Sequence, residues 1–236
     1  MQKQPSDRIG RTAAVVKDFG VGRVALLGHV LRKSIQQIVK EAQRQNGSAD
    51  YWSGFTGERT FDRFRDAEKA FIAARDSFYM ATVSETGWPY VQHRGGPSGF
   101  IHVLDDKTFA VADFRGNRQY ISVGNLAAGN RAALILMDYA NRRRLKILAH
   151  VEIKTLDDDP ELAAAVVTPG YKARPERVLK FHLDAFDWNC SQHITQRFTE
   201  AEVMEALTLM RARMAQLEAE NASLRDKLAA QDHTVL

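Results

Sequence analysis

Polar and basic side chains follow strand-like segments at several points of this 236-residue chain. The most informative stretch, residues 87–96, contains Gln92, His93 and Arg94. It comes after residues 77–83, which have strand composition, and a Ser-Glu-Thr-Gly turn separates the two. We predict a β-hairpin whose second strand carries polar groups toward a ligand.

The same layout recurs twice further along the chain. A predicted strand at 108–113 is followed by Gly116, Asn117 and Arg118, and residues 142–148 begin with three arginines. Three strands bordered by arginine, glycine and asparagine indicate a barrel wall that holds an anionic small molecule. An apolar ring system with a phosphate tail fits this description.

Asn117 and Arg118 are candidates for holding a phosphate. A helix that begins near Asn117 would offer free amide hydrogens and the positive end of its dipole, with Ser122 one turn further on. The alternative is a plain strand-to-helix turn in which Asn117 is an ordinary cap, because Gly-Asn turns are common.

The run Arg142-Arg143-Arg144 precedes an apolar strand. Adjacent strand residues point to opposite faces, so Arg143 cannot share a face with both neighbours. Guanidinium groups match phosphates and polarised carbonyls well, but a solvated hairpin turn explains the run equally well.

Trp188, Cys190 and His193 bring aromatic, thiol and imidazole groups close together in sequence. A Cys-x-x-His pair supplies only two ligands and has no partner pair, so we expect no metal site. A Cys–His nucleophile also lacks the known family signatures. We expect Trp188 to pack over a planar ligand or a subunit interface.

Composition excludes several classes of protein. A hydrophobic fraction of 44% and a charged fraction of 26% are ordinary for a soluble globular chain. The net charge of +4 is not gathered into one stripe, so nucleic acid is not an expected partner. No apolar run reaches the roughly 20 residues of a membrane helix, and the N-terminus lacks a signal-peptide pattern. With a single cysteine, these features predict a cytoplasmic protein without membrane attachment.

Helical patterns occur at 1–50, 51–76 and 199–230, and strands alternate with turns over 77–188. We divide the chain into a helical extension at 1–60, a β-rich domain at 61–198 and a charged helix at 199–236. The extension has apolar residues at helical spacing, at Leu27, Leu31, Ser34, Ile35 and Ile38. A second helix within 51–76, capped by Thr60, would present Phe61, Phe64, Ala67, Phe71 and Ile72 on one side. A short helix is expected near 161–167 after the turn at 157–160.

The last helix carries the clearest periodic signal. Its apolar stripe alternates spacings of four and three, at Val203, Leu207, Met210, Met214, Leu217, Asn221, Leu224 and Leu228. This is the a/d pattern of a coiled coil, and a lone asparagine at an a position favours a parallel pair. The alternative is an amphipathic helix packed on its own domain. Glu200, Glu202 and Glu205 lie at the start of this helix, so no basic DNA-binding region leads into the coil.

Taken together, these motifs resemble the pyridoxamine-phosphate-oxidase-like FMN-binding split-barrel family. The resemblance covers about 61–198 and rests on residues 78–83, 87–89, 92–97, 113–126, 142–146 and 187–194. It implies an α+β fold with a mainly β core: a six-stranded antiparallel split β-barrel with N-terminal helices and a C-terminal coiled-coil helix. It also implies a homodimer with FMN in the cleft between subunits.

The resemblance assigns roles to individual positions. The strand along the flavin ring would be Gln92, His93, Arg94 and Gly95. The phosphate would be held by Asn117, Arg118 and Ser122. Arg144 would touch the flavin from the next strand, and Trp188 would approach the ring from the partner subunit.

Departures from the family pattern exclude one of the activities known in the family. The closing arginine- and tryptophan-bearing signature of true pyridoxamine phosphate oxidases is absent, so vitamin B6 oxidation is not expected, and Ala149 replaces a usual strand glycine. We predict a flavin-dependent oxidoreductase acting on a small molecule, with His93 as the candidate acid or base. The alternative is a non-catalytic flavin-binding or sensing module that dimerises through its coiled coil. A deazaflavin or haem in place of FMN remains open.

Overall fold

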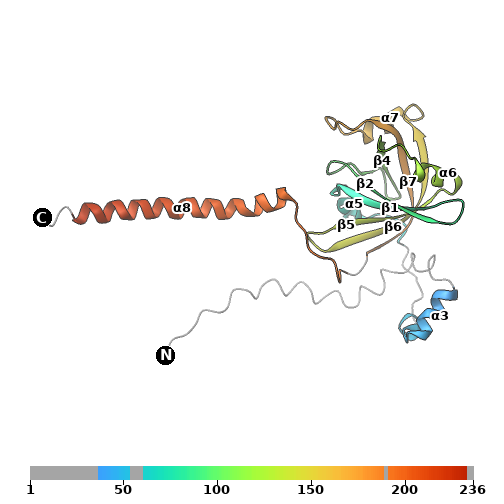
Figure 1. The fold of residues 1–236 in the computed structure, drawn as a ribbon, viewed down its shortest axis with the longest axis horizontal. Helices are drawn as coiled ribbons and strands as arrows, with labels where there is room; N and C mark the ends of the chain where they lie inside the picture. Colours follow the sequence, from blue (N-terminus) through green and yellow to red (C-terminus); the bar gives the residue numbers. More distant parts are fainter. Residues whose placement is uncertain (1–36, 54–60, 189–190, 233–236) are drawn as a thin grey trace. The chain divides into compact units, whose positions relative to one another are not determined.

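The computed structural model describes residues 37–53, 61–188 and 191–232 (Figure 1). The first described helices are α3 (Gln37–Gln45) and α4 (Ala49–Ser53). The predicted cap Thr60, the apolar residues between Leu27 and Ile35, and Cys190 lie outside the described residues. The chain forms two compact units, the second of which consists of residues 139–141 and 193–236.

A seven-stranded sheet forms the body of the first unit, in the order β2-β1-β5-β6-β7-β4-β3. All neighbouring strands are antiparallel. The strands are β1 (Ser77–Val83), β2 (Pro89–Gly95), β3 (His102–Val103), β4 (Thr108–Phe114), β5 (Arg131–Asp138), β6 (Arg143–Thr155) and β7 (Pro175–Trp188). Six strands were predicted, and the seventh is β3, a two-residue strand that pairs with the edge of β4. The terminal strands β2 and β3 are not neighbours, so the sheet is not closed.

The predicted hairpin of β1 and β2 is confirmed, with Ser77 opposite Gly95 and Val83 opposite Pro89. Its turn contains Gly87 at φ 84°, a left-handed conformation that glycine adopts without steric cost. Along β1, Phe78 and Met80 are buried, while Tyr79 between them is exposed. This alternation fixes the register, since a one-residue slip would expose both side chains.

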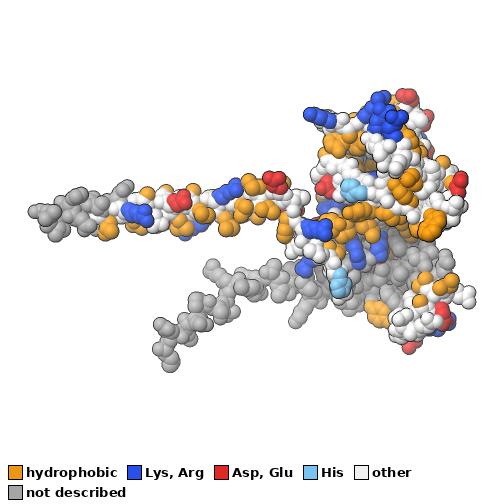
Figure 2. All heavy atoms as spheres, viewed as in Figure 1, with side chains coloured by type: hydrophobic (Ala, Val, Ile, Leu, Met, Phe, Trp, Pro, Cys, Tyr) orange, Lys and Arg blue, Asp and Glu red, His pale blue; other side chains and the backbone are white. Residues whose placement is uncertain are grey.

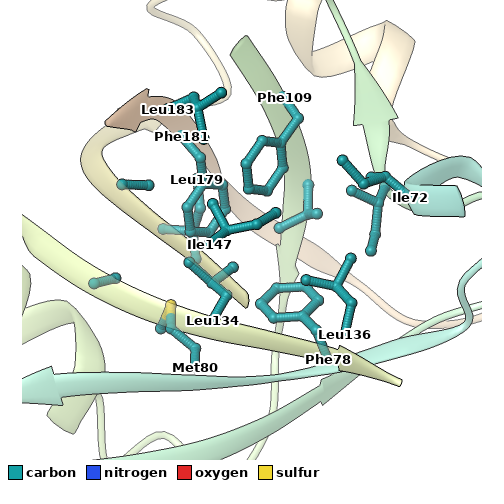
Figure 3. Packing of buried hydrophobic residues seen from close by; sticks show 14 of the residues in the cluster. Ile72, Phe78, Met80, Phe109, Leu134, Leu136, Ile147, Leu179, Phe181 and Leu183 are labelled. Atoms are coloured by element: carbon teal, nitrogen blue, oxygen red, sulfur yellow. The ribbon is translucent and has the colours of Figure 1, made fainter. Parts of the chain in front are cut away.

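The main core lies between the curved strands and helix α5 (Asp66–Ala73), as Figure 3 shows. Phe109 of β4 stacks on Phe181 of β7 with ring centroids 4.6 Å apart. Phe71 and Ile72 are the buried apolar residues of α5. Burying one such side chain stabilises the fold by roughly 1.5–3 kcal/mol.

Phe61 and Phe64 do not belong to a helix face, contrary to prediction, because α5 begins only at Asp66. The backbone of this segment bonds to the strand region instead: Phe186 N donates to Phe61 O at 3.1 Å, and Phe64 N donates to Asp106 O at 2.6 Å. Both rings still reach the core, where each contacts Phe186.

A smaller apolar cluster covers the other side of β4. Helix α7 (Pro160–Val166) packs against Ala110 and Ala112 of β4 and Val178 of β7 (Figure 1). Asp159 caps this helix by accepting a hydrogen bond from Leu162 N at 3.0 Å. The predicted helix start in this turn is confirmed, and β4 is held between two cores.

The second unit contains α8 (Glu200–Asp232), one uninterrupted helix of 33 residues. The predicted long C-terminal helix is confirmed as a helix. Among the described helices, none has both the length and the apolar character needed to cross a membrane.

Candidate functional site

A cavity of about 310 Å³ lies where β2, the end of β4 and the start of α6 (Ile121–Ala128) meet. Residues 171, 173 and 176, at and before the start of β7, complete its lining. The cavity brings together seven of the nine predicted cofactor-binding residues: Gln92, His93, Arg94, Gly95, Asn117, Arg118 and Ser122.

Helix α6 is tied to the β1–β2 hairpin by two side-chain hydrogen bonds. Ser122 Oγ donates to Gln92 Oε1 at 2.7 Å, and Asn125 Nδ2 donates to Thr82 Oγ1 at 3.0 Å. Ser122, Asn125 and Thr82 are all buried. Since buried polar pairs have no water to compete for them, these bonds set the distance between the helix and the strand.

Arg94 lines the cavity and forms an ion pair with Asp113, the last buried residue of β4. Arg177 Nη1 approaches the other oxygen of Asp113 at 3.4 Å. The carboxylate therefore lies between two guanidinium groups. The Nε of Arg94 is buried and has no hydrogen-bond partner in the described structure.

The loop between β4 and α6 has an unusual backbone. Arg118 has φ 64° and Tyr120 has φ 53°, so two non-glycine residues adopt the left-handed conformation. Asn117 Oδ1 accepts a hydrogen bond from Gln119 N at 3.1 Å, which makes a local Asx turn. The helix begins at Ile121 rather than near Asn117, because left-handed dihedrals at 118 and 120 cannot continue into a helix. Asn117 therefore neither caps the helix nor lies in its first turn. The prediction that the helix begins near Asn117 is wrong.

Arg118 is exposed and makes no hydrogen bond or ion pair with the residues that the structure describes. Its neighbour Arg115 is engaged, because Nε donates to Glu176 Oε1 at 2.8 Å. That bond lowers the pKa of Glu176, and the Tyr120 hydroxyl at 3.0 Å adds to the effect. Within this loop, Arg118 is the arginine left available to an anionic ligand.

His93 lines the cavity, yet its side chain belongs to the outer face of the hairpin. It lies directly opposite Tyr79, with the two rings 5.4 Å apart, whereas Gln92 and Arg94 lie opposite the buried Met80 and Phe78. A Cβ at position 95 would lie 3.1 Å from His93 Cε1, so glycine leaves room for the imidazole. The face that carries Gln92 and Arg94 does not carry the His93 imidazole.

A family model described as pyridoxamine 5'-phosphate oxidase matches residues 64–187, more than half of the chain. The chain belongs to this family. The matched span contains strands β1 to β6, β7 except for its last residue, and every lining residue of the cavity.

Several solved structures are similar to part of this chain at low sequence identity. HupZ of Group A Streptococcus is 16% identical, with 57% of this chain and 99% of that chain covered and a TM-score of 0.41. An FMN-binding protein from Syntrophomonas wolfei is 14% identical, with 52% and 83% covered and a TM-score of 0.36. A FAD-binding protein from Mesorhizobium loti is 12% identical, with 53% and 94% covered and a TM-score of 0.37. No curated protein matches the chain.

Trp188 is one of two predicted site residues that the structure places away from the cavity. Its Nε1 donates to Glu68 Oε1 at 2.7 Å, and its ring contacts Phe71 of α5 at 4.7 Å. The guanidinium of Arg143 lies 4.6 Å from the same ring. Trp188 thus packs against α5 of its own chain.

Arg144 is the other residue outside the cavity. It lies on β6 near Asp187, a buried carboxyl group whose pKa is raised to about 6 by desolvation. Lys146 and Arg144 partly oppose that rise. The predicted alternation of the arginine run holds, since Arg143 contacts aromatic rings while Arg144 lies near Asp187.

Sequence reasoning missed Arg177, Glu176 and Tyr120. Arg177 stands opposite Asp113 in the β4–β7 pairing, more than sixty positions away in the chain, so no local motif connects them. No group of three or more potential metal ligands occurs in the part of the chain that the structure describes.

Proposed function

We propose that this protein binds FMN in the cavity, with the flavin ring along Gln92–Gly95 and the phosphate at Gly116–Arg118. The observation that carries the proposal is the meeting of these two segments at one cavity, joined by the Ser122–Gln92 hydrogen bond. Membership in the pyridoxamine 5'-phosphate oxidase family supports the same ligand class.

The residues present suit such a ligand. Arg118 has an uncommitted guanidinium group, which forms strong bonds to phosphate oxygens. Gly116 leaves open space where another residue would have a Cβ, so a phosphate can approach the backbone. Phe100 and Val111 supply apolar lining, and about 310 Å³ is within the usual range of roughly 300–1,000 Å³ for ligand pockets.

Bound FMN would supply the hydride or electron transfer itself, while the protein positions and tunes it. Arg94 of β2 carries a positively charged guanidinium group, and its ion pair with Asp113 in buried surroundings holds that group in place. A positive charge there stabilises negative charge on the ring. Oxidoreductase activity on a small molecule is therefore the first function that we propose.

A flavin-binding or sensing module without turnover is the second candidate, and one observation favours it. The carboxylates of the cavity, Asp113 and Glu176, are both bonded to arginines, and His93 points to the outer face. None of the three is placed as a general acid or base on the Arg94 side of the hairpin.

Two further features belong to the proposal. We propose a homodimer, since the outward face of the hairpin exposes Tyr79, Val83 and Val91 at 41%, 54% and 61%. Exposed apolar patches of this kind mark interaction surfaces. We also propose a cytoplasmic location, which suits a chain with a single cysteine.

The absorption spectrum of protein purified without added cofactor tests the ligand class, because flavin, deazaflavin and haem have different bands. Flavin bands support the proposal, and haem bands or a colourless protein that fails to take up FMN contradict it. Chemical reduction followed by aerobic and substrate-driven reoxidation then separates the two functions. A sensing module would take up flavin without accelerating its reoxidation by any small molecule.

A further inference from the structure

We infer that α8 pairs with α8 of a second copy of this chain, parallel and in register, as a two-stranded coiled coil. This inference is independent of the cofactor. In such a coil the apolar stripe packs against the same stripe of the second copy, and the charged residues beside it form ion pairs between the two helices.

Within its own unit, the described residues leave the stripe uncovered. Met210, Met214, Leu224 and Leu228 are exposed at 61%, 58%, 56% and 63%. Figure 2 shows hydrophobic side chains recurring along the coloured part of the helix. None of the described side chains of α8 is buried, and a helix about 50 Å long gains little stability from its own backbone.

Asn221 sets the orientation of the pair. It occupies an a position, and in a parallel in-register coil its amide meets the same amide of the second copy. In an antiparallel coil, a positions face d positions, which here are the apolar Val203, Met210, Leu217 and Leu224. Asn221 would then bury its amide against an apolar side chain, which is costly.

The residues that flank the stripe have complementary charges in a parallel, in-register coil. A parallel coil brings each g residue near the e residue five positions further along the partner. That rule pairs Arg213 with Glu218 and Glu220 with Arg225, and Lys227 and Asp232 repeat the spacing in sequence. Each of these combinations joins opposite charges.

Among the described residues of one chain, three of these charged residues have no ionic partner. Glu218, Glu220 and Arg225 make no hydrogen bond or ion pair with described residues. Arg213 donates only to the neutral Gln216, at 2.9 Å. A second copy of α8 would therefore bury the apolar stripe and supply oppositely charged partners for the residues that border it.

Cysteine cross-linking of the full-length chain tests the inference, in a Cys190→Ser background. Met210→Cys and Leu228→Cys lie near the two ends of the stripe, and each should oxidise to a covalent dimer at least tenfold faster than Ala219→Cys. Ala219 is the matched control, because its f position lies on the outer side of the coil. Cross-linking only when the Met210→Cys and Leu228→Cys chains are mixed would show an antiparallel pair. Rates equal to the control would show that α8 does not pair with itself, and either result overturns the inference.

A charge exchange tests the register without relying on a thiol near the stripe's centre. In the Leu228→Cys chain, Glu220→Arg places like charges opposite each other and should slow cross-linking on the order of fivefold. Adding Arg225→Glu should restore the original rate, because the pair is re-formed with reversed charges. A double variant no faster than Glu220→Arg alone would contradict the register.

Discussion

The hydroxyl of Ser122 donates a 2.7 Å hydrogen bond to the side-chain oxygen of Gln92. This bond connects the first turn of α6 with the strand proposed to lie along the flavin ring. It therefore sets the separation between the proposed ring site and the proposed phosphate site, which come from segments 30 residues apart.

Replacing Ser122 should loosen that connection. Ser122→Ala removes the donor and leaves Gln92 without its partner, so we expect a loss of about 1–2 kcal/mol in the free energy of unfolding. FMN affinity should fall as well. Urea unfolding and fluorescence titration measure the two effects, and the exposed Ser98→Ala is the control. A stability equal to that of the control would show that the bond is unimportant.

Two arginines in left-handed turns provide a matched comparison. Arg118 and Arg142 have φ values of 64° and 51°, so an alanine at either position costs similar backbone strain. Arg118→Ala should weaken FMN binding by roughly 1.5–3 kcal/mol, the worth of a charge-assisted hydrogen bond, and Arg142→Ala should have far less effect. Titration of both variants decides the ranking. The reverse order would refute the placement of the phosphate at Gly116–Arg118.

Asp187 should make stability depend on pH in an unusual direction. Desolvation raises the pKa of its carboxyl group to about 6. The folded state therefore holds this proton more tightly than the unfolded state, and the contribution of Asp187 to stability declines as pH rises from about 4 to about 6.

The variant Asp187→Asn should remove this decline. Relative to wild type, we expect it to gain about 1–2 kcal/mol of stability between pH 4 and pH 7, allowing for solvent screening and for the opposing charges of Lys146 and Arg144. Urea unfolding at several pH values measures the difference, with the exposed Asp157→Asn as control. A constant difference between wild type and Asp187→Asn across this range would contradict the assignment.

Truncation after Thr199 should leave a dimer. The exposed apolar face of the hairpin is proposed to make the main interface, whereas the α8 stripe spans only about four heptads. Removing residues 200–236 should lower the melting temperature without giving monomers. Light scattering of the truncated chain is the measurement, and a clean monomer would mean that α8 alone makes the dimer. Loss of FMN together with dimerisation would indicate a site shared between subunits.

Local signals in the sequence were sufficient for several elements. The Ser-Glu-Thr-Gly turn and its flanking strands predicted β1 and β2, Asp159-Pro160 predicted the start of α7, and heptad spacing predicted α8. Each of these elements depends on interactions between residues close in sequence, namely the turn conformation, the helix cap or the spacing of apolar residues.

Other features depend on contacts between distant segments. Arg177 reaches Asp113 only because β7 pairs with β4, and Trp188 finds Glu68 across 120 positions. Phe61 and Phe64 have helical spacing, yet their backbone bonds to the strand region. The start of α6 was misplaced because Arg118 and Tyr120 adopt left-handed conformations without the glycine that usually signals them.

Calorimetric titration of the wild-type chain with FMN, FAD and riboflavin tests the central claim most directly. We expect about one FMN per chain, weaker binding of FAD, and riboflavin binding at least tenfold weaker than FMN, because riboflavin lacks the phosphate that Arg118 is proposed to hold. In Arg118→Ala the preference for FMN over riboflavin should largely disappear. Equal affinity of the wild-type protein for FMN and riboflavin would contradict a phosphate site at Gly116–Arg118.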